Sequence, residues 1–237
     1  MSLFSKIFNS FKSIRLNTNK VLSGQPLNDV LISSMYAEQQ SAYLNSYETG
    51  LGKSDIVKLL EQYWEVFSKE EAIKVLEDLH DRNHDKNLNI VYEAFDDQEN
   101  YVQILKSNLP SEQDSFNYYL NIYRSLKDVV PELIEQQVIT SFSEIKKVKD
   151  SGWNYGRGAF LARCCYEMGY LTEKELKDYL EKSYQELKQY CSTWKEYTIS
   201  YIFGRAIWGG SHNSGMIQIA NDLLTNEKSP LKNKTYL

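Results

Sequence analysis

Apolar positions along this chain recur mostly at intervals of three and four residues, which is the period of an amphipathic helix. Clear examples begin at Ser54, with "SDIVKLLEQYWEVF", and at Ser68, with "SKEEAIKVLEDLH". Ser68 with Glu71, and Thr172 with Glu175, have the spacing of a capping box at a helix start. No stretch has the pattern of a convincing strand. The pattern therefore predicts an all-α protein of about ten helices, packed as an irregular multi-helix bundle.

Breaks in this pattern divide the chain into three segments. Residues 1–22 predict an amphipathic, basic N-terminal helix, because apolar residues have helical spacing and the first acid is Asp29. Residues 23–225 predict the helical domain, with a weak seam near residues 108–111 where a proline interrupts the pattern. Residues 226–237 form a polar tail that we expect to be disordered.

The N-terminal helix has three interpretations, of which we favour docking on the protein's own core. The first alternative is a helix that lies on an anionic membrane surface through residues 2–15. The second is a helix that docks in a groove of a partner. The segment does not resemble a secretory signal, because its apolar run is interrupted and no small-residue cleavage site follows.

Composition and charge restrict the classes of partner. The net charge of -5 over 237 residues provides no electrostatic footprint for nucleic acid, so we expect none as a partner. The three cysteines, Cys164, Cys165 and Cys191, are odd in number and two are adjacent, which argues against a disulfide framework. We therefore predict a cytoplasmic protein. No motif calls for a cofactor, and we predict none.

Two stretches repeat one pattern of aromatic, glycine and arginine residues. "WNYGRGAF" begins at Trp153 and "YIFGRAIW" begins at Tyr201, and each places these residue types at helical spacing on one face. A glycine inside a helix costs about 1 kcal/mol relative to alanine. We therefore expect a backbone or a bulky ring to approach each glycine, with the two helices crossing there or flanking one shared element.

The arginines of this repeat, Arg157 and Arg205, lie on apolar faces, where an isolated charge is costly. The interpretation we favour is structural: each arginine pairs with an internal carboxylate, such as Asp150, Glu167 or Glu196, or stacks on a ring. The alternative is that both arginines converge on one cleft and hold an anion. That anion would be a carboxylate, a phosphate or an acidic side chain of a partner.

The stretch "GWNYGRGAFLARCCYEMGYLTEKE" and the later "STWKEYTISYIFGRAIWGG" resemble a bacterial family of domains of unknown function, numbered 1266. The resemblance covers residues 150–210 well and extends weakly over "LLEQYWEVFSKEEAIKVLEDLH". It implies a mostly helical bacterial protein and no defined activity. The family pattern has an acid after the tryptophan, where this chain has Asn154, and Trp194 is shifted by one position. If that acid is catalytic in the family, its replacement argues against an enzyme.

One pair of histidines has metal-ligand spacing. His80 and His84 in "HDRNH" are one helical turn apart, as in a metal pair. The segment is very polar, and the sequence offers no evident third ligand. We therefore predict a solvated helix end and no metal site.

These observations lead to two hypotheses about function. The leading one is a non-enzymatic cytoplasmic interaction protein, similar in role to an immunity protein or antitoxin, that binds a protein partner through a Tyr/Trp-rich helical surface. The alternative is an enzyme or small-ligand binder with an anion pocket between Arg157 and Arg205. We predict no catalytic residues. The candidate binding residues are Trp153, Asn154, Arg157, Trp194, Tyr197, Tyr201, Arg205 and Trp208.

Overall fold

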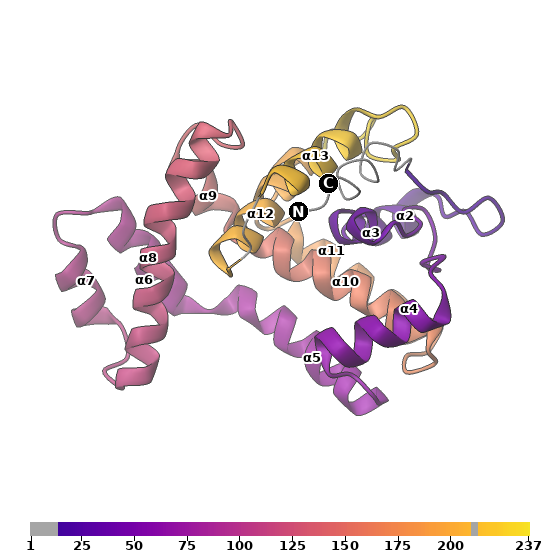
Figure 1. The fold of residues 1–237 in the computed structure, drawn as a ribbon, viewed down its shortest axis with the longest axis horizontal. Helices are drawn as coiled ribbons and strands as arrows, with labels where there is room; N and C mark the ends of the chain where they lie inside the picture. The colour runs from indigo at the N-terminus through magenta and orange to yellow at the C-terminus, as the bar shows by residue number, and fades with distance from the viewer. Residues whose placement is uncertain (1–13, 210–212) are drawn as a thin grey trace, which may run out of the picture.

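The computed structural model describes residues 14–209 and 213–237 of the chain. The predicted all-α, multi-helix bundle is confirmed: these residues form helices, and their only extended pairings are two isolated bridges. In chain order (Figure 1) the elements are α2 (Gly24–Leu31), α3 (Ser34–Gln40), α4 (Lys53–Lys58), the π-helical turn η1 (Leu59–Tyr63), α5 (Lys69–Asp81), the 3-10 turn η2 (Arg82–His84), α6 (Lys86–Asp96), α7 (Tyr101–Asn108), α8 (Gln113–Glu135), α9 (Phe142–Val148), α10 (Ser151–Glu167), α11 (Glu173–Leu187), α12 (Trp194–Ile207) and α13 (Ser214–Thr225).

Helix α10 is the centre of the fold. It packs against α12, α11, α5 and α3 (Figure 1), and nearly all of its residues are buried. Its sequence is accordingly rich in apolar and small residues, as expected of a helix surrounded by others, although it also carries polar residues such as Asn154, Arg157 and Arg163. Helix α12 is buried in the same way along most of its length. The site residues predicted from the repeat therefore lie on the two most enclosed helices.

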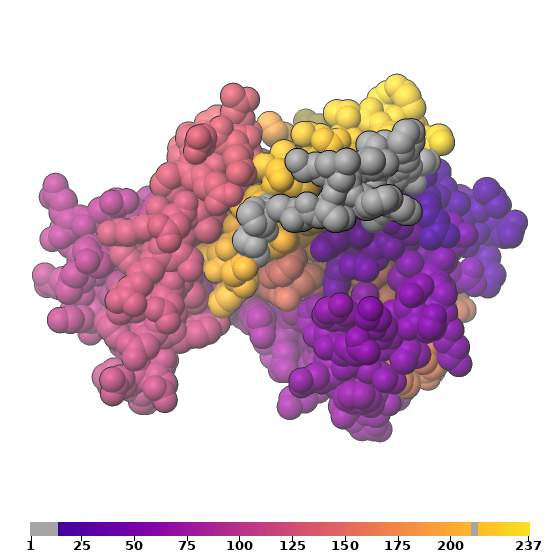
Figure 2. Space-filling model, in the orientation of Figure 1, coloured from indigo at the N-terminus to yellow at the C-terminus, as the bar shows by residue number. Residues whose placement is uncertain are grey.

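Helices α6, α7 and α8 pack on one another. This group contacts the rest of the protein where α8 packs on α12, and the next helix, α9, packs on α12 as well. In Figure 2 the atoms of α8 and α9 lie on one side of α12, and those of α4 and α5 lie on the other. The weak seam near residues 108–111 falls between α7 and α8, which belong to this one packed group. The seam is therefore a turn within the group.

The two terminal segments differ from expectation. Of the predicted helix over residues 1–22, residues 1–13 lie outside the described part, and residues 14–22 are not helical. The tail, residues 226–237, is packed rather than disordered. The backbone N–H of Trp194 donates to the Thr235 carbonyl at 3.2 Å, and the backbone N–H of Leu237 donates to the Ser192 carbonyl at 3.2 Å. Leu231 is buried, so the tail carries an apolar anchor among its polar residues.

Helix starts follow the capping signals in the sequence. The Thr172–Glu175 capping box is present at α11, and the Ser68 hydroxyl accepts the Glu71 N–H at 3.2 Å at α5. A further capping box, Thr193 with Glu196, opens α12. These caps satisfy backbone donors that would otherwise lack partners.

Candidate functional site

The glycines of the repeat lie where α10 and α12 meet. A β-carbon added at Gly204 would lie 2.3 Å from the Cβ of Trp153 and 3.0 Å from the Cβ of Asp150. One added at Gly156 would lie 3.0 Å from the Tyr201 ring and 3.0 Å from the Tyr197 hydroxyl. The expectation of two helices that approach closely at their glycines is therefore met, because only a residue without a side chain fits.

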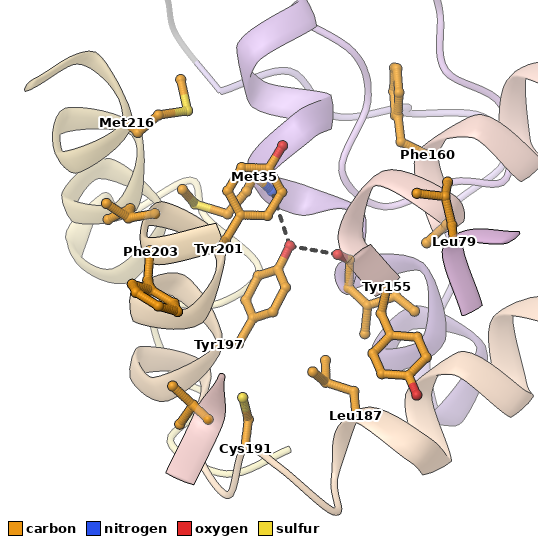
Figure 3. Packing of buried hydrophobic residues seen from close by; sticks show 14 of the residues in the cluster. Met35, Leu79, Tyr155, Phe160, Leu187, Cys191, Tyr197, Tyr201, Phe203 and Met216 are labelled. Carbon is orange, nitrogen blue, oxygen red and sulfur yellow. Dashed lines mark hydrogen bonds between the residues drawn. The ribbon is translucent and has the colours of Figure 1, made fainter. Parts of the chain in front are cut away.

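Trp194 and Tyr197 lie in the core and not on a surface. Both side chains are fully buried. The Tyr197 hydroxyl donates to the Ile32 carbonyl at 2.5 Å and accepts the Met35 N–H at 3.5 Å (Figure 3). Tyr197 therefore ties α12 to the turn between α2 and α3. An exposed Tyr/Trp-rich surface cannot include these two residues, because the helical spacing that suggested a surface belongs to a helix buried on every side.

Arg157 is held between indole rings. Its guanidinium lies 4.1 Å from the ring centre of Trp153 and 5.5 Å from that of Trp64. Its Nε donates to the Trp153 carbonyl at 3.2 Å, and its Nη2 donates to Oδ1 of Asn154 at 2.9 Å. Burial lowers the pKa of Arg157 to about 10, so it stays a cation at neutral pH. Stacking on a ring, one part of the structural interpretation, is thus present.

The acids proposed as partners for the arginines bind elsewhere. Glu167 accepts the backbone N–H of Thr49, and Glu196 pairs with Lys147 at 2.7 Å while capping α12. Asp150 approaches Arg157 only through an intermediate residue. Within the described residues no carboxylate forms an ion pair with Arg157, so that part of the structural interpretation is not met.

Asn154 is that intermediate residue. Its Nδ2 donates to Oδ2 of Asp150 at 3.1 Å, and its Oδ1 accepts from Arg157. The same Asp150 oxygen accepts the Trp208 indole N–H at 2.8 Å. Burial raises the pKa of Asp150, against the opposing effect of its hydrogen bonds to Trp208 and Asn154. A neutral amide thus separates a buried acid from a partly buried cation, and no ion pair joins the two side chains.

Two buried polar groups beside Arg157 have no hydrogen-bond partner among the described residues. They are the indole Nε1 of Trp153 and the hydroxyl of Tyr201, whose rings contact edge to face at 5.0 Å. Burial raises the pKa of Tyr201 well above its usual value, and the charges of Arg157 and Arg205 act in the opposite direction. Both arginines of the repeat therefore influence one unpartnered hydroxyl. Such groups need an explanation, because buried donors are ordinarily satisfied.

A third arginine, Arg82 of η2, lies close enough to Arg157 to influence it electrostatically. Its charge lowers the pKa of Arg157, and its side chain forms no hydrogen bond or ion pair with any part of the chain that the structure describes. Arg205 donates to Oδ1 of Asn213 at 3.3 Å, which links it to α13. We call the following group the arginine–aromatic cluster: Asp150, Trp153, Asn154, Arg157, Tyr201 and Trp208. Arg82 and Arg205 add positive charge at its edge.

Six of the eight residues predicted from the sequence therefore come together, and Trp194 and Tyr197 belong to the core. Tyr201 is as fully buried as these two, so it cannot be part of an exposed surface either. Sequence reasoning missed Arg82, which reaches the cluster from a turn some seventy positions away and carries no local signal. It named Asp150 only as a partner for an arginine. The one available signal was its position, one helical turn before Asn154.

Fold and cluster together define a helical protein in which a partly buried arginine, without a carboxylate partner among the described residues, lies among aromatic rings beside the two central helices. The chain belongs to the family described as "Protein of unknown function (DUF1266)", whose family model matches residues 59–236. The match begins in η1 and runs through the cluster into the tail, well beyond the residues that carry the resemblance in sequence. Searches of curated proteins and of solved structures found no match. Among the residues described, no helix combines the length and apolar character needed to cross a bilayer.

Proposed function

We propose that this protein binds an anionic ligand, through a carboxylate or phosphate group, at the arginine–aromatic cluster. The observation that carries the proposal is Arg157, a largely buried guanidinium with no carboxylate partner in the described chain. Beside it stand the unpartnered Trp153 indole N–H and Tyr201 hydroxyl. An anion bound at Arg157 would accept its hydrogen bonds and offset the burial of the guanidinium charge.

The geometry of Arg157 leaves donors for such a ligand. Its Nε and Nη2 are engaged by Trp153 and Asn154, which fix the plane of the guanidinium, and its Nη1 makes no hydrogen bond to a described residue. Arg82 and Arg205 add attraction at the edge.

The predicted protein partner is compatible with the same binding site, and we propose it as the second candidate source of the anion. Here the anion is an acidic side chain or a terminal carboxylate of the partner. Support comes from the rim of the cluster: Tyr118 is 48% exposed and lies 6.0 Å from Trp208, ring centre to ring centre. Arg82 beside it is also exposed. The immunity-like role and the bacterial origin stay predictions. We also propose a cytoplasmic location, supported by three cysteines that are all free and buried.

Binding is tested by titrating the full-length protein with phosphate, citrate and a short acidic peptide, using calorimetry and tryptophan fluorescence. Arg157→Lys keeps the positive charge and removes the planar fork of donors. We expect it to weaken anion binding by about tenfold or more, which is about 1.4 kcal/mol, with the helical content unchanged. Arg124→Lys, at an exposed arginine of α8 outside the cluster, is the matched control and should bind as the wild type does.

The two forms of the proposal are separated by the ligand that responds. Binding of the small anions favours a small-molecule ligand, and binding of the peptide alone favours a protein partner. The proposal fails if the wild type binds none of the probes, or if Arg157→Lys binds them as tightly as Arg124→Lys.

A further inference from the structure

A second group of polar residues lies near α10, apart from the arginine–aromatic cluster. His80 lies in the last turn of α5, His84 lies in η2, and Glu186 comes from the last turn of α11. One ligand atom from each of these three residues lies within 4.8 Å of the other two. The sequence supplied the histidine pair but not Glu186, which is more than a hundred positions away and is brought in by the packing of α11.

The expected solvated helix end is wrong for His80. Its side chain is only 7% exposed and packs edge to face on Tyr155, 5.5 Å between ring centres. Glu186 is 21% exposed and His84 is 56% exposed. Solvent exposure therefore increases across the three side chains, from the buried His80 through Glu186 to the exposed His84.

One carboxylate oxygen is the focus of this site. Oε2 of Glu186 lies 2.7 Å from Nε2 of His80 and 3.5 Å from Nε2 of His84, and it accepts the Tyr155 hydroxyl at 2.8 Å. Two imidazole nitrogens and a phenol thus converge on a single oxygen. A cation between the three side chains would instead use both imidazole lone pairs. The Tyr155 hydroxyl would then remain as the donor that orients the carboxylate.

The distances suit a small divalent ion. Metal–ligand bonds of about 2.0–2.2 Å in a tetrahedral site separate the ligand atoms by about 3.3 Å. The His84 to Glu186 distance already has this value within 0.2 Å, and the His80 to Glu186 distance must open by about 0.6 Å, a change within reach of one side-chain rotation. Two histidines and one carboxylate, with a fourth position left to water, is a donor set typical of catalytic zinc sites.

We propose that His80, His84 and Glu186 bind a divalent transition-metal ion of the Zn²⁺ type, with its fourth position open to solvent. Lys182, one turn before Glu186, is the nearby charge that opposes a cation.

A pocket of about 480 Å³ adjoins the site. His80 forms part of its lining, together with Leu76, Tyr179 and Lys182. The pocket has room for a small molecule beside the ion, and Lys182 would attract a negatively charged one. The metal site is independent of the proposed anion binding, because the two groups share no residue.

The test is titration of the metal-free, full-length protein with Zn²⁺ by calorimetry, and with Co²⁺ by visible absorption, which reports the coordination geometry. We expect one ion per chain for the wild type. His84→Ala should abolish tight binding, and its exposed position leaves the fold intact. Tyr155→Phe keeps the ring and removes the orienting hydroxyl, so we expect a 10–100-fold loss of affinity. Asp81→Asn, at an exposed acid between the histidines, is the matched control and should bind as the wild type does.

Glu186→Gln tests the third ligand and should lose binding to a similar degree as His84→Ala. If this variant fails to fold, the comparison of His84→Ala with Asp81→Asn still decides the question. The proposal is overturned if the wild type binds no stoichiometric metal. It is also overturned if His84→Ala binds Zn²⁺ as tightly as Asp81→Asn does.

Discussion

Replacement of Gly204 by alanine is the most direct test of the contact between α10 and α12. The new β-carbon would lie 2.3 Å from the Cβ and 2.8 Å from the Cγ of Trp153. Carbon atoms in contact are ordinarily about 3.5–4.0 Å apart, so the two helices must separate by about 1.2 Å or more. Trp153 cannot yield by rotating, because the obstructing atom is the root of its side chain.

The magnitude follows from two opposing effects. Overpacking of a tight core costs about 1–3 kcal/mol, and we take the upper end because backbone must move. Alanine in place of glycine within a helix contributes about 1 kcal/mol in the other direction. The expected net loss is therefore about 2 kcal/mol in the free energy of unfolding. Urea denaturation followed by circular dichroism measures it as a lower midpoint with an unchanged slope.

Gly215→Ala is the matched control for this experiment. Gly215 lies in the first turn of α13, and no atom of the described residues stands within 4 Å of an added β-carbon. The same chemical change should therefore raise stability by about 0.5–1 kcal/mol. If Gly204→Ala proves as stable as the wild type, or gains as Gly215→Ala does, then α10 and α12 do not approach as closely as described.

Three further predictions concern buried polar groups. Arg163 is fully buried and donates to Oγ of Ser33 and to three backbone carbonyls of residues 43–48, so Arg163→Met should cost about 3 kcal/mol or more in urea denaturation, and a loss below about 1 kcal/mol would contradict its role. Burial raises the pKa of Asp150 above its ordinary 3.8, so the folded state binds the carboxyl proton more tightly than the unfolded chain does. The free energy of unfolding should therefore fall as the pH rises from 3.8 through the pKa of the folded state. Asp150→Asn removes the titrating group, so the variant should be at least as stable as the wild type at pH 7, whereas at pH 3 it should not be. The reasoning is refuted if the stability of the variant, measured relative to the wild type at the same pH, is lower at pH 7 than at pH 3. Burial raises the pKa values of Cys165 and Cys191 to about 12, so iodoacetamide should label these thiols only in urea, and rapid labelling of the native protein would show that they are accessible.

Features with a local signal were predictable from the sequence. Helix periods, capping boxes and the two interior glycines depend on residues a few positions apart, and the structure contains all three kinds of feature. The tail was misjudged because its polar composition conceals Leu231, whose burial depends on packing that the sequence does not display. Trp194 and Tyr197 were wrongly placed on an aromatic surface for a different reason. Trp194 and Tyr197 recur at helical spacing, and that spacing is the same for a stripe in the core and a stripe on a surface.

Long-range partners could not be predicted, and Asn154 shows what this changes for function. In the sequence, an asparagine in place of the family's acid suggests the loss of a functional carboxylate. In the structure a carboxylate is present one helical turn earlier, at Asp150, and Asn154 joins it to Arg157. The substitution therefore does not deprive the cluster of an acid. It keeps the acid and the cation apart, which leaves Nη1 of Arg157 without a hydrogen bond to a described residue and available to a ligand. A departure from the family pattern that first argued only against catalysis thus becomes an argument for anion binding.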